Sequence, residues 1–144
     1  MLRYQQDLIR IGSYTLRPID QPYVLEDPWE TSVQNVYQKL KYEMQQRNRI
    51  RIMIYGYYLG KLIQLSITPR EKWQEFTRSH QISNGYYFFK GSTRIYELFK
   101  RDPNQIYQTL ALSFRIIARM KTPDLQQLLQ CNQELDEIFE SVEL

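Results

Sequence analysis

The stretch TPREKWQEFTRSHQISNGYYFFKGSTRIYELF, residues 68–99, decides the fold class. Its first two residues, Thr68 and Pro69, favour a helix start. A threonine oxygen accepts hydrogen bonds from the free amides of a first turn, and proline suits the first helical position. Glu71 adds a reciprocal capping residue, and apolar side chains then recur at helical spacing on both sides of a short polar interruption. The stretch therefore predicts two consecutive helices, with Ser83 as the N-cap of the second.

The same pairing of a cap-forming residue with a proline recurs along the chain. It is found at Asp27-Pro28, Asp102-Pro103 and Thr122-Pro123, with Glu30 and Gln105 as reciprocal capping residues, and Ser113 is a further N-cap. The chain is 42% hydrophobic, which is enough to form a core and excludes disorder as its main state. Six helix starts within 144 residues predict the all-α fold class, in the form of a compact multi-helix domain.

The number of helices between Pro28 and Leu65 is left open by the sequence. The apolar periodicity fits either one long helix bent near Gly56 and Gly60 or two helices broken near Asn48. The two glycines stand four residues apart and so share one face of a helix. Because they carry no side chain, they predict that another helix packs closely there.

Residues 1–26 differ from the rest of the chain. They contain Pro18 and Pro22 and an alternating apolar stretch around Gly12-Ser13, a pattern typical of an extended arm or a short hairpin. Two isolated strands are only marginally stable in water. We therefore expect an extended N-terminal arm that lies across its own helices or on a partner.

Charge is distributed unevenly over residues 27–144, the expected single helical domain. The basic middle, residues 44–121, carries fourteen Lys/Arg against four Asp/Glu, whereas the acidic last helix, residues 122–144, carries six Asp/Glu and no Lys/Arg. A surface this basic attracts polyanions, because it neutralises phosphates and releases counterions. The acidic helix is either a solvated amphipathic face, a cover for the basic surface or a dock for a basic partner.

The cysteine, histidine, glycine and glutamate residues argue against an enzyme. Cys131 and His80 are the single cysteine and histidine, so the sequence offers no internal disulfide, no Cys/His zinc site and no hydrolase site that needs a second histidine. No glycine-rich phosphate loop is present. Glu71 and Glu75 stand at helical spacing beside basic residues, as surface ion pairs do. We expect no catalytic residue, no metal, no cofactor and, because the apolar run at 52–59 is short, no membrane contact.

A helix-turn-helix is the first candidate DNA-binding element. Ile82 supplies the apolar turn residue and Ser83 the cap, although Gln81 or His80 stands where a glycine is usual. If the second helix enters a major groove, its early polar side chains contact the DNA. These side chains are Asn84, Lys90 and Arg94. The alternative is that the two helices are ordinary neighbours in a bundle.

Two arginine-rich clusters extend this basic surface. They consist of Arg47, Arg49 and Arg51, and of Arg115, Arg119 and Lys121. The first and last arginine of each cluster lie one helical turn apart and share a face. The planar fork of arginine suits phosphate, which makes both clusters candidates for nucleic-acid contact. The alternatives are a solvated face, or pairing with the acidic last helix or a protein partner.

Clustered tyrosines are the candidate protein contacts. The two groups include Tyr57 and Tyr58, and Tyr86 and Tyr87. The second pair opens a run of aromatic residues too long for every ring to face one core, so some rings are expected at the surface. Tyrosine contributes a large contact area to an interface, which favours binding of a partner protein here.

Three segments of the chain carry a resemblance to known proteins. They are YYLGKL at 57–62, a segment at 82–99 that contains Ile82-Ser83, Tyr86-Tyr87 and GSTRIYELF, and LSFRI at 112–116, in a chain with many scattered glutamines. Their order resembles small helical DNA-associated proteins of protists and early-branching fungi. Among these, the chain is similar to a non-catalytic subunit of the ciliate nuclear DNA adenine methyltransferase complex. The resemblance implies a location in the nucleus and a different subunit that carries the methyl-donor site, and it transfers no catalytic residue.

We therefore expect a non-catalytic accessory subunit of a nuclear complex that acts on DNA, most specifically a DNA adenine methyltransferase complex. Its partners would be protein subunits, bound by the arm and the tyrosines, and DNA, bound by the basic middle. The alternative is a purely structural subunit of a large assembly, for example a mitochondrial complex, with no nucleic-acid contact. DNA binding that weakens steeply with salt distinguishes the two.

Overall fold

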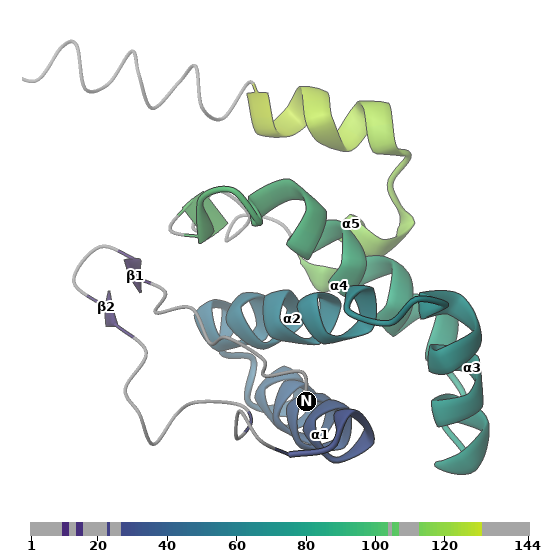
Figure 1. Cartoon of the computed structure of the whole chain (residues 1–144). Coiled ribbons are helices and arrows are strands. Elements are labelled where there is room, and N and C mark those ends of the chain that lie inside the picture. The colour runs from purple at the N-terminus through teal and green to yellow at the C-terminus, as the bar shows by residue number, and fades with distance from the viewer. Residues whose placement is uncertain are drawn as a thin grey trace, which may run out of the picture.

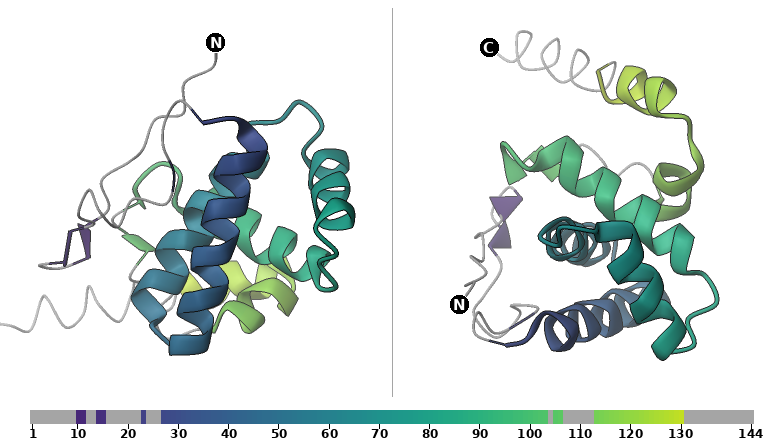
Figure 2. Two further views of the ribbon diagram at one scale, coloured as in Figure 1. Left: turned by 90° about the horizontal axis from the view of Figure 1, so that it is seen from below. Right: turned by 45° about the vertical axis from the view of Figure 1, so that its right-hand side comes forward.

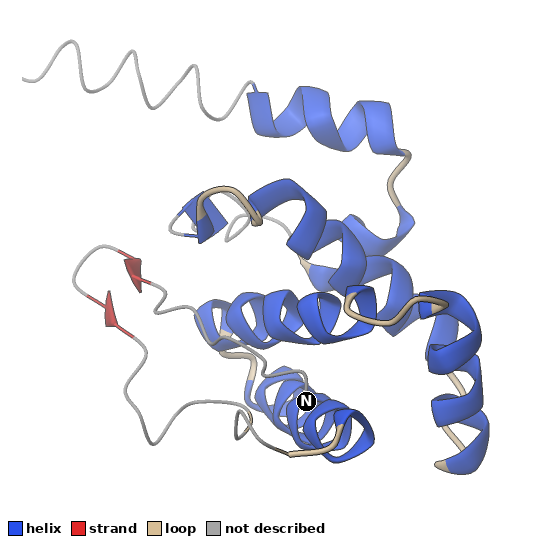
Figure 3. Ribbon diagram, in the orientation of Figure 1, coloured by secondary structure: helices blue, strands red, loops and turns tan. Residues whose placement is uncertain are grey.

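The computed structural model describes residues 10–11, 14–15, 23, 27–103, 105–106 and 113–130. Five helices are α1 (Trp29–Gln46), α2 (Arg49–Gln64), α3 (Pro69–Ser79), α4 (Gly85–Phe99) and α5 (Phe114–Arg119) (Figure 1). Residues 122–130 are also helical, so the predicted all-α fold class is confirmed (Figure 3). Most of the N-terminal arm and the acidic last helix beyond residue 130 lie outside the described residues.

Two short strands precede the helices. Strand β1 (Arg10–Ile11) pairs antiparallel with β2 (Tyr14–Thr15), with Arg10 opposite Thr15 and Ile11 opposite Tyr14. This pairing agrees with the hairpin alternative for the arm. Tyr23 is buried and meets Tyr58 of α2 edge to face, with ring centroids 5.9 Å apart. At this residue the chain before α1 packs against its own helices.

The chain breaks between α1 and α2, as the second of the two alternatives predicted. Arg47 ends α1 in the left-handed conformation, with φ 56°, and the Asn48 amide donates back to the carbonyl of Glu43 at 3.1 Å. This 6→1 bond satisfies a carbonyl that the helix end leaves unpaired. The Asn48 side chain then caps α2 by accepting from the Arg51 amide at 3.2 Å.

Five of the six predicted helix starts are correct within two residues, whereas the described residues after Asp102-Pro103 form only a 3₁₀ turn. The side-chain caps expected for α1, α3 and α4 are not formed as predicted. Pro69 is the first residue of α3, yet Thr68 makes no side-chain capping bond. Ser113 does cap α5, accepting from the Ile116 amide at 3.2 Å. Ser83 is the expected cap of α4, but Asn84 occupies that position.

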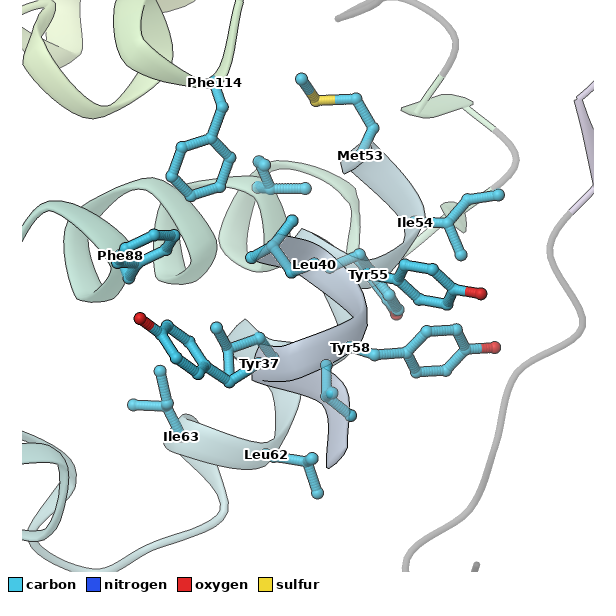
Figure 4. Close-up of a cluster of buried hydrophobic side chains, with 14 of the residues drawn as sticks. Tyr37, Leu40, Met53, Ile54, Tyr55, Tyr58, Leu62, Ile63, Phe88 and Phe114 are labelled. Atoms are coloured by element: carbon cyan, nitrogen blue, oxygen red, sulfur yellow. The ribbon is translucent and has the colours of Figure 1, made fainter. Parts of the chain in front are cut away.

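Helix α2 is the centre of the fold. Figure 2 shows it almost end-on in the right-hand view, between α1 and α4. Residues 53–60 are buried without interruption, so the helix has no solvent face over two turns. A helix that is apolar all round can be stable only if other elements surround it. The close-up in Figure 4 shows side chains from α1, α2, α4 and α5 filling this core.

Glycines set the spacing between α2 and its neighbours. A Cβ atom added at Gly60 would lie 2.1 Å from the backbone oxygen of Ser92, so the two helices touch backbone to backbone there. A Cβ at Gly91 would lie 2.5 Å from the ring of Phe114. The expectation that the α2 glycines mark a close helix approach is confirmed at Gly60.

Helix α3 is held to the body by aromatic residues. The indole N–H of Trp73 donates to the carbonyl of Gly85 at 2.7 Å, which fixes the start of α4 against α3. Tyr37 of α1 meets the rings of Trp73, Phe76 and Phe88, with centroids 5.1 to 6.3 Å apart. Three helices therefore meet around one buried tyrosine.

Candidate nucleic-acid interface

Residues from both arginine-rich clusters converge on one groove. The groove has a volume of about 340 Å³ and lies between the α1–α2 turn, the first turn of α4 and the start of α5. It is lined by Met44, Arg47, Arg49, Ile52, Met53, Tyr87, Ser113, Phe114 and Arg115, and we call it the basic groove. Figure 4 shows Met53 and Phe114 at the same end of the core. Among the described residues, the lining contains no Asp or Glu, so cationic groups stand around an apolar floor.

The ends of three helices place Arg47, Arg49 and Arg115 at the groove. Arg47 projects from the turn where α1 ends, and Arg49 follows as the first residue of α2. Arg115 lies in the first turn of α5, which Ser113 caps. All three arginines are exposed. They come from segments more than sixty residues apart in the sequence, and only the packing of α5 against α4 brings them to one site.

Tyr87 joins the arginines in the groove. Its ring meets Phe88 and Phe114 edge to face, with both centroids at 5.3 Å. Burial raises the pKa of Tyr87 above the usual tyrosine range, and the positive charges of Arg119 and Arg115 partly oppose that rise. The phenol therefore stays protonated at neutral pH and offers a hydroxyl donor beside the arginines.

The remaining members of the two clusters lie apart from the groove lining. Arg51 is half-buried, donates to the Tyr55 hydroxyl at 3.5 Å and lines a different cavity with Glu43. Arg119 and Lys121 are exposed on and just beyond α5. The expected alignment of Arg47 with Arg51 is wrong, because α1 ends at Gln46 and a left-handed turn separates them.

The structure favours the alternative to a helix-turn-helix, in which α3 and α4 are ordinary neighbours in a bundle. Helix α4 packs against α2 on one side and α5 on the other, and only Tyr86 and Glu97 are exposed along its length. A recognition helix needs a continuous exposed face. Lys90 is half-buried and its ammonium lies 6.0 Å from the Tyr86 ring centre. Asn84 is exposed but lines a separate cavity of about 380 Å³.

Arg94 has a structural contact in place of the expected DNA contact. Its guanidinium donates to the carbonyls of Ile117, at 2.8 Å, and of Met120, and to the Thr122 hydroxyl at 3.0 Å. These carbonyls belong to the C-terminal end of α5, where free acceptors and the helix dipole favour a cation. Arg94 therefore ties α4 to α5 and positions the element that carries Arg115.

The partner-binding tyrosines divide into two classes. Tyr57 and Tyr58 have only 1% and 0% of their surfaces exposed, so the expectation that they meet a partner is wrong. The reason is that α2 is surrounded on all sides, including by Tyr23. Tyr86 is 65% exposed and remains a candidate contact, and Tyr87 is half-buried and lines the basic groove.

Sequence reasoning misses several surface features. Ile67, between α2 and α3, is fully exposed, and Leu65 beside it is 46% exposed. Leu65 and Ile67 alternate with Gln64 and Ser66 just past the end of α2, so only the helix boundary shows that they face solvent. The groove is missed as well, because apolar periodicity places Met53 and Phe114 in the core, where they are buried, and does not show that Met44 and Ile52 remain half-buried beside them.

Glu71, Glu75 and His80, the side chains that could serve as acids or bases, do not line one common pocket among the described residues. Glu71 and Glu75 are exposed on α3, and the His80 ring nitrogen lies 3.2 Å from a carboxylate oxygen of Glu30. Within the described ranges, no group of three or more His, Cys, Asp or Glu side chains is placed to hold a metal ion. No helix in the described part of the chain has both the length and the apolar character needed to cross a bilayer.

Comparison of the chain with protein-family models, with curated proteins and with solved structures finds no match.

Proposed function

We propose that this protein is a non-catalytic accessory subunit of a nuclear complex that acts on DNA, and that the basic groove contacts the phosphate backbone. The observation that carries the proposal is the convergence of Arg47, Arg49 and Arg115 on one groove, whose described lining residues include no acidic side chain. Guanidinium groups bind phosphate oxygens in pairs, and the Tyr87 hydroxyl adds a neutral donor. Such contacts position a duplex without reading its sequence.

The more specific proposal is a DNA adenine methyltransferase complex, and the resemblance of three segments supports it. In the structure, parts of these segments pack on one another. Gly60 of the first touches Ser92 of the second, and Phe114 of the third covers Gly91. The resemblance therefore concerns residues that build the core around the groove. Another subunit would carry the chemistry in this proposal.

The test is the salt dependence of binding to duplex DNA, measured by fluorescence anisotropy on the full chain. The Arg47→Gln/Arg115→Gln variant should bind more weakly to every sequence. The slope of log K against log salt should fall by about 0.9 for each phosphate that the variant no longer neutralises. The matched control is Arg70→Gln/Arg78→Gln, which removes the same charge from exposed positions of α3. Equal losses of affinity in both variants, or no binding by the parent at low salt, would refute the proposal.

The alternative, a structural subunit of a large assembly without nucleic-acid contact, is favoured by the exposed apolar residues. Ile67, Leu65 and Tyr86 would be covered if a partner protein packed over them. The same anisotropy experiment separates the two functions. Purification of the native protein then identifies the assembly, since DNA-modifying and mitochondrial partners are different proteins.

A further inference from the structure

The basic groove combines two properties that a phosphate backbone alone does not use. Its rim is cationic, and its floor is apolar. Met44 and Ile52 are half-buried and form the accessible part of the floor, above the buried side chains of Met53 and Phe114. A phosphate needs only the rim. An acidic amphipathic segment would use both, because its carboxylates can pair with the arginines while its apolar stripe covers the floor.

The chain itself contains such a segment. Residues 131–144 carry five Asp/Glu and no Lys/Arg. Four apolar residues stand at the i, i+3, i+4, i+7 spacing of one helical face. They are Leu135, Ile138, Phe139 and Val142. The charge and the apolar pattern of the segment therefore complement those of the groove.

The segment follows a helix, residues 122–130, whose first residue is fixed to α4 beside the end of α5. Thr122, the first residue of the helix at 122–130, is joined to Arg94 directly after α5, the helix that carries Arg115. Leu125 and Leu129 anchor that helix in the core. Fourteen residues follow residue 130, and they span about 21 Å as a helix or at most about 50 Å when extended. If this length spans the distance to the groove, the tether gives a millimolar effective concentration, so that even a weak contact is populated.

We propose that residues 131–144 dock in the basic groove of their own chain, with the apolar stripe on the floor and the carboxylates on Arg47 and Arg115. The docked segment occupies the positions that phosphates would take, so it competes with DNA. This regulatory consequence rests on the proposed function, whereas the docking itself does not. In the docked state, the acidic end of the chain therefore contacts its basic middle.

The test places a nitroxide on the segment in the full chain. The variant Cys131→Ser/Ser141→Cys carries one cysteine, and residue 141 lies off the apolar stripe. In a ¹⁵N-labelled sample, the amide signals of Arg47, Met53 and Arg115 should lose most of their intensity relative to the reduced nitroxide. Broadening centred elsewhere, or none, would overturn the proposal.

Two controls sharpen this test. Adding Arg47→Gln/Arg115→Gln should restore the signals around the groove, whereas Arg70→Gln/Arg78→Gln should leave the broadening unchanged. A mixture of ¹⁵N-labelled chains without nitroxide and unlabelled chains with nitroxide detects contact between copies. Broadening in this mixture equal to that within one chain would assign the segment to a second copy and overturn the intramolecular proposal.

DNA binding provides a separate readout. We replace the five acidic residues of the segment by their amides and measure affinity for duplex DNA. If the docked state holds about nine-tenths of the molecules, affinity should rise about tenfold. The rise should be much smaller when Arg47 and Arg115 are also glutamine. Docking without DNA binding would refute the proposed function alone, and DNA binding without docking would refute this inference alone.

Discussion

The contact between Gly60 and Ser92 predicts a large effect from a single methyl group. In Gly60→Ala the new Cβ would lie 2.1 Å from the Ser92 carbonyl oxygen and 2.8 Å from the Cβ of Tyr96. The obstacle is the backbone of α4, which no side-chain rotation can move aside. Helix α4 must therefore shift by about 1 Å to restore an ordinary contact.

The neighbouring Gly56 provides a matched control within the same helix. Alanine is favoured over glycine in a helix interior by about 1 kcal/mol at both positions. At Gly56 the nearest atom is the end of the Ile95 side chain, at 3.0 Å, which can give way. Overpacking against backbone costs about 1–3 kcal/mol or more. We expect Gly60→Ala to lose about 2 kcal/mol net and Gly56→Ala to stay within about 1 kcal/mol of the parent.

Urea unfolding followed by circular dichroism measures both variants. Gly60→Ala should show a lower midpoint with an unchanged slope, and its melting temperature should fall by about 4–8 °C. Gly56→Ala should unfold close to the parent. If Gly60→Ala is as stable as Gly56→Ala, the backbone contact between α2 and α4 does not exist as described, and the reasoning fails.

Two further predictions concern stability. Arg94→Ala leaves carbonyls at the end of α5 without their donor and should cost about 1–2 kcal/mol in urea unfolding, whereas Arg101→Ala, exposed just after α4, should change less than about 0.5 kcal/mol. Equal effects would contradict the capping role of Arg94. Burial raises the pKa of Tyr37, so the folded state favours the protonated phenol. The free energy of unfolding should therefore keep its full value below about pH 10 and fall as the pH rises further. Tyr37→Phe should weaken this alkaline loss, and an unchanged profile of unfolding midpoint against pH would refute that assignment.

Helix positions were predictable because their signals are local. Pro69 and Ser113 act within one turn of a helix, and Asn48 breaks the chain through its own conformation and that of Arg47. Apolar periodicity depends only on residues close in sequence. No knowledge of the partner helix is needed to predict that these segments are helical.

Exposure could not be predicted in the same way. Tyr58 has the composition of an interface residue, but α2 is enclosed and Tyr23 covers it. Arg94 has the position of a DNA contact on an isolated helix, but the end of α5 arrives beside it. Both misassignments arise from residues more than twenty positions away in the sequence.

The sequence by itself determined that this chain is helical, where most of its helices begin, and that its basic charge lies in the middle. The tertiary structure alone decided which arginines act together, since Arg47 and Arg115 meet only because α5 packs on α4. The physical reason is the distance along the sequence over which each interaction acts. Caps and periodicity act over one or two turns, whereas a binding groove needs side chains from distant segments, and their meeting depends on how closely glycines let the helices approach.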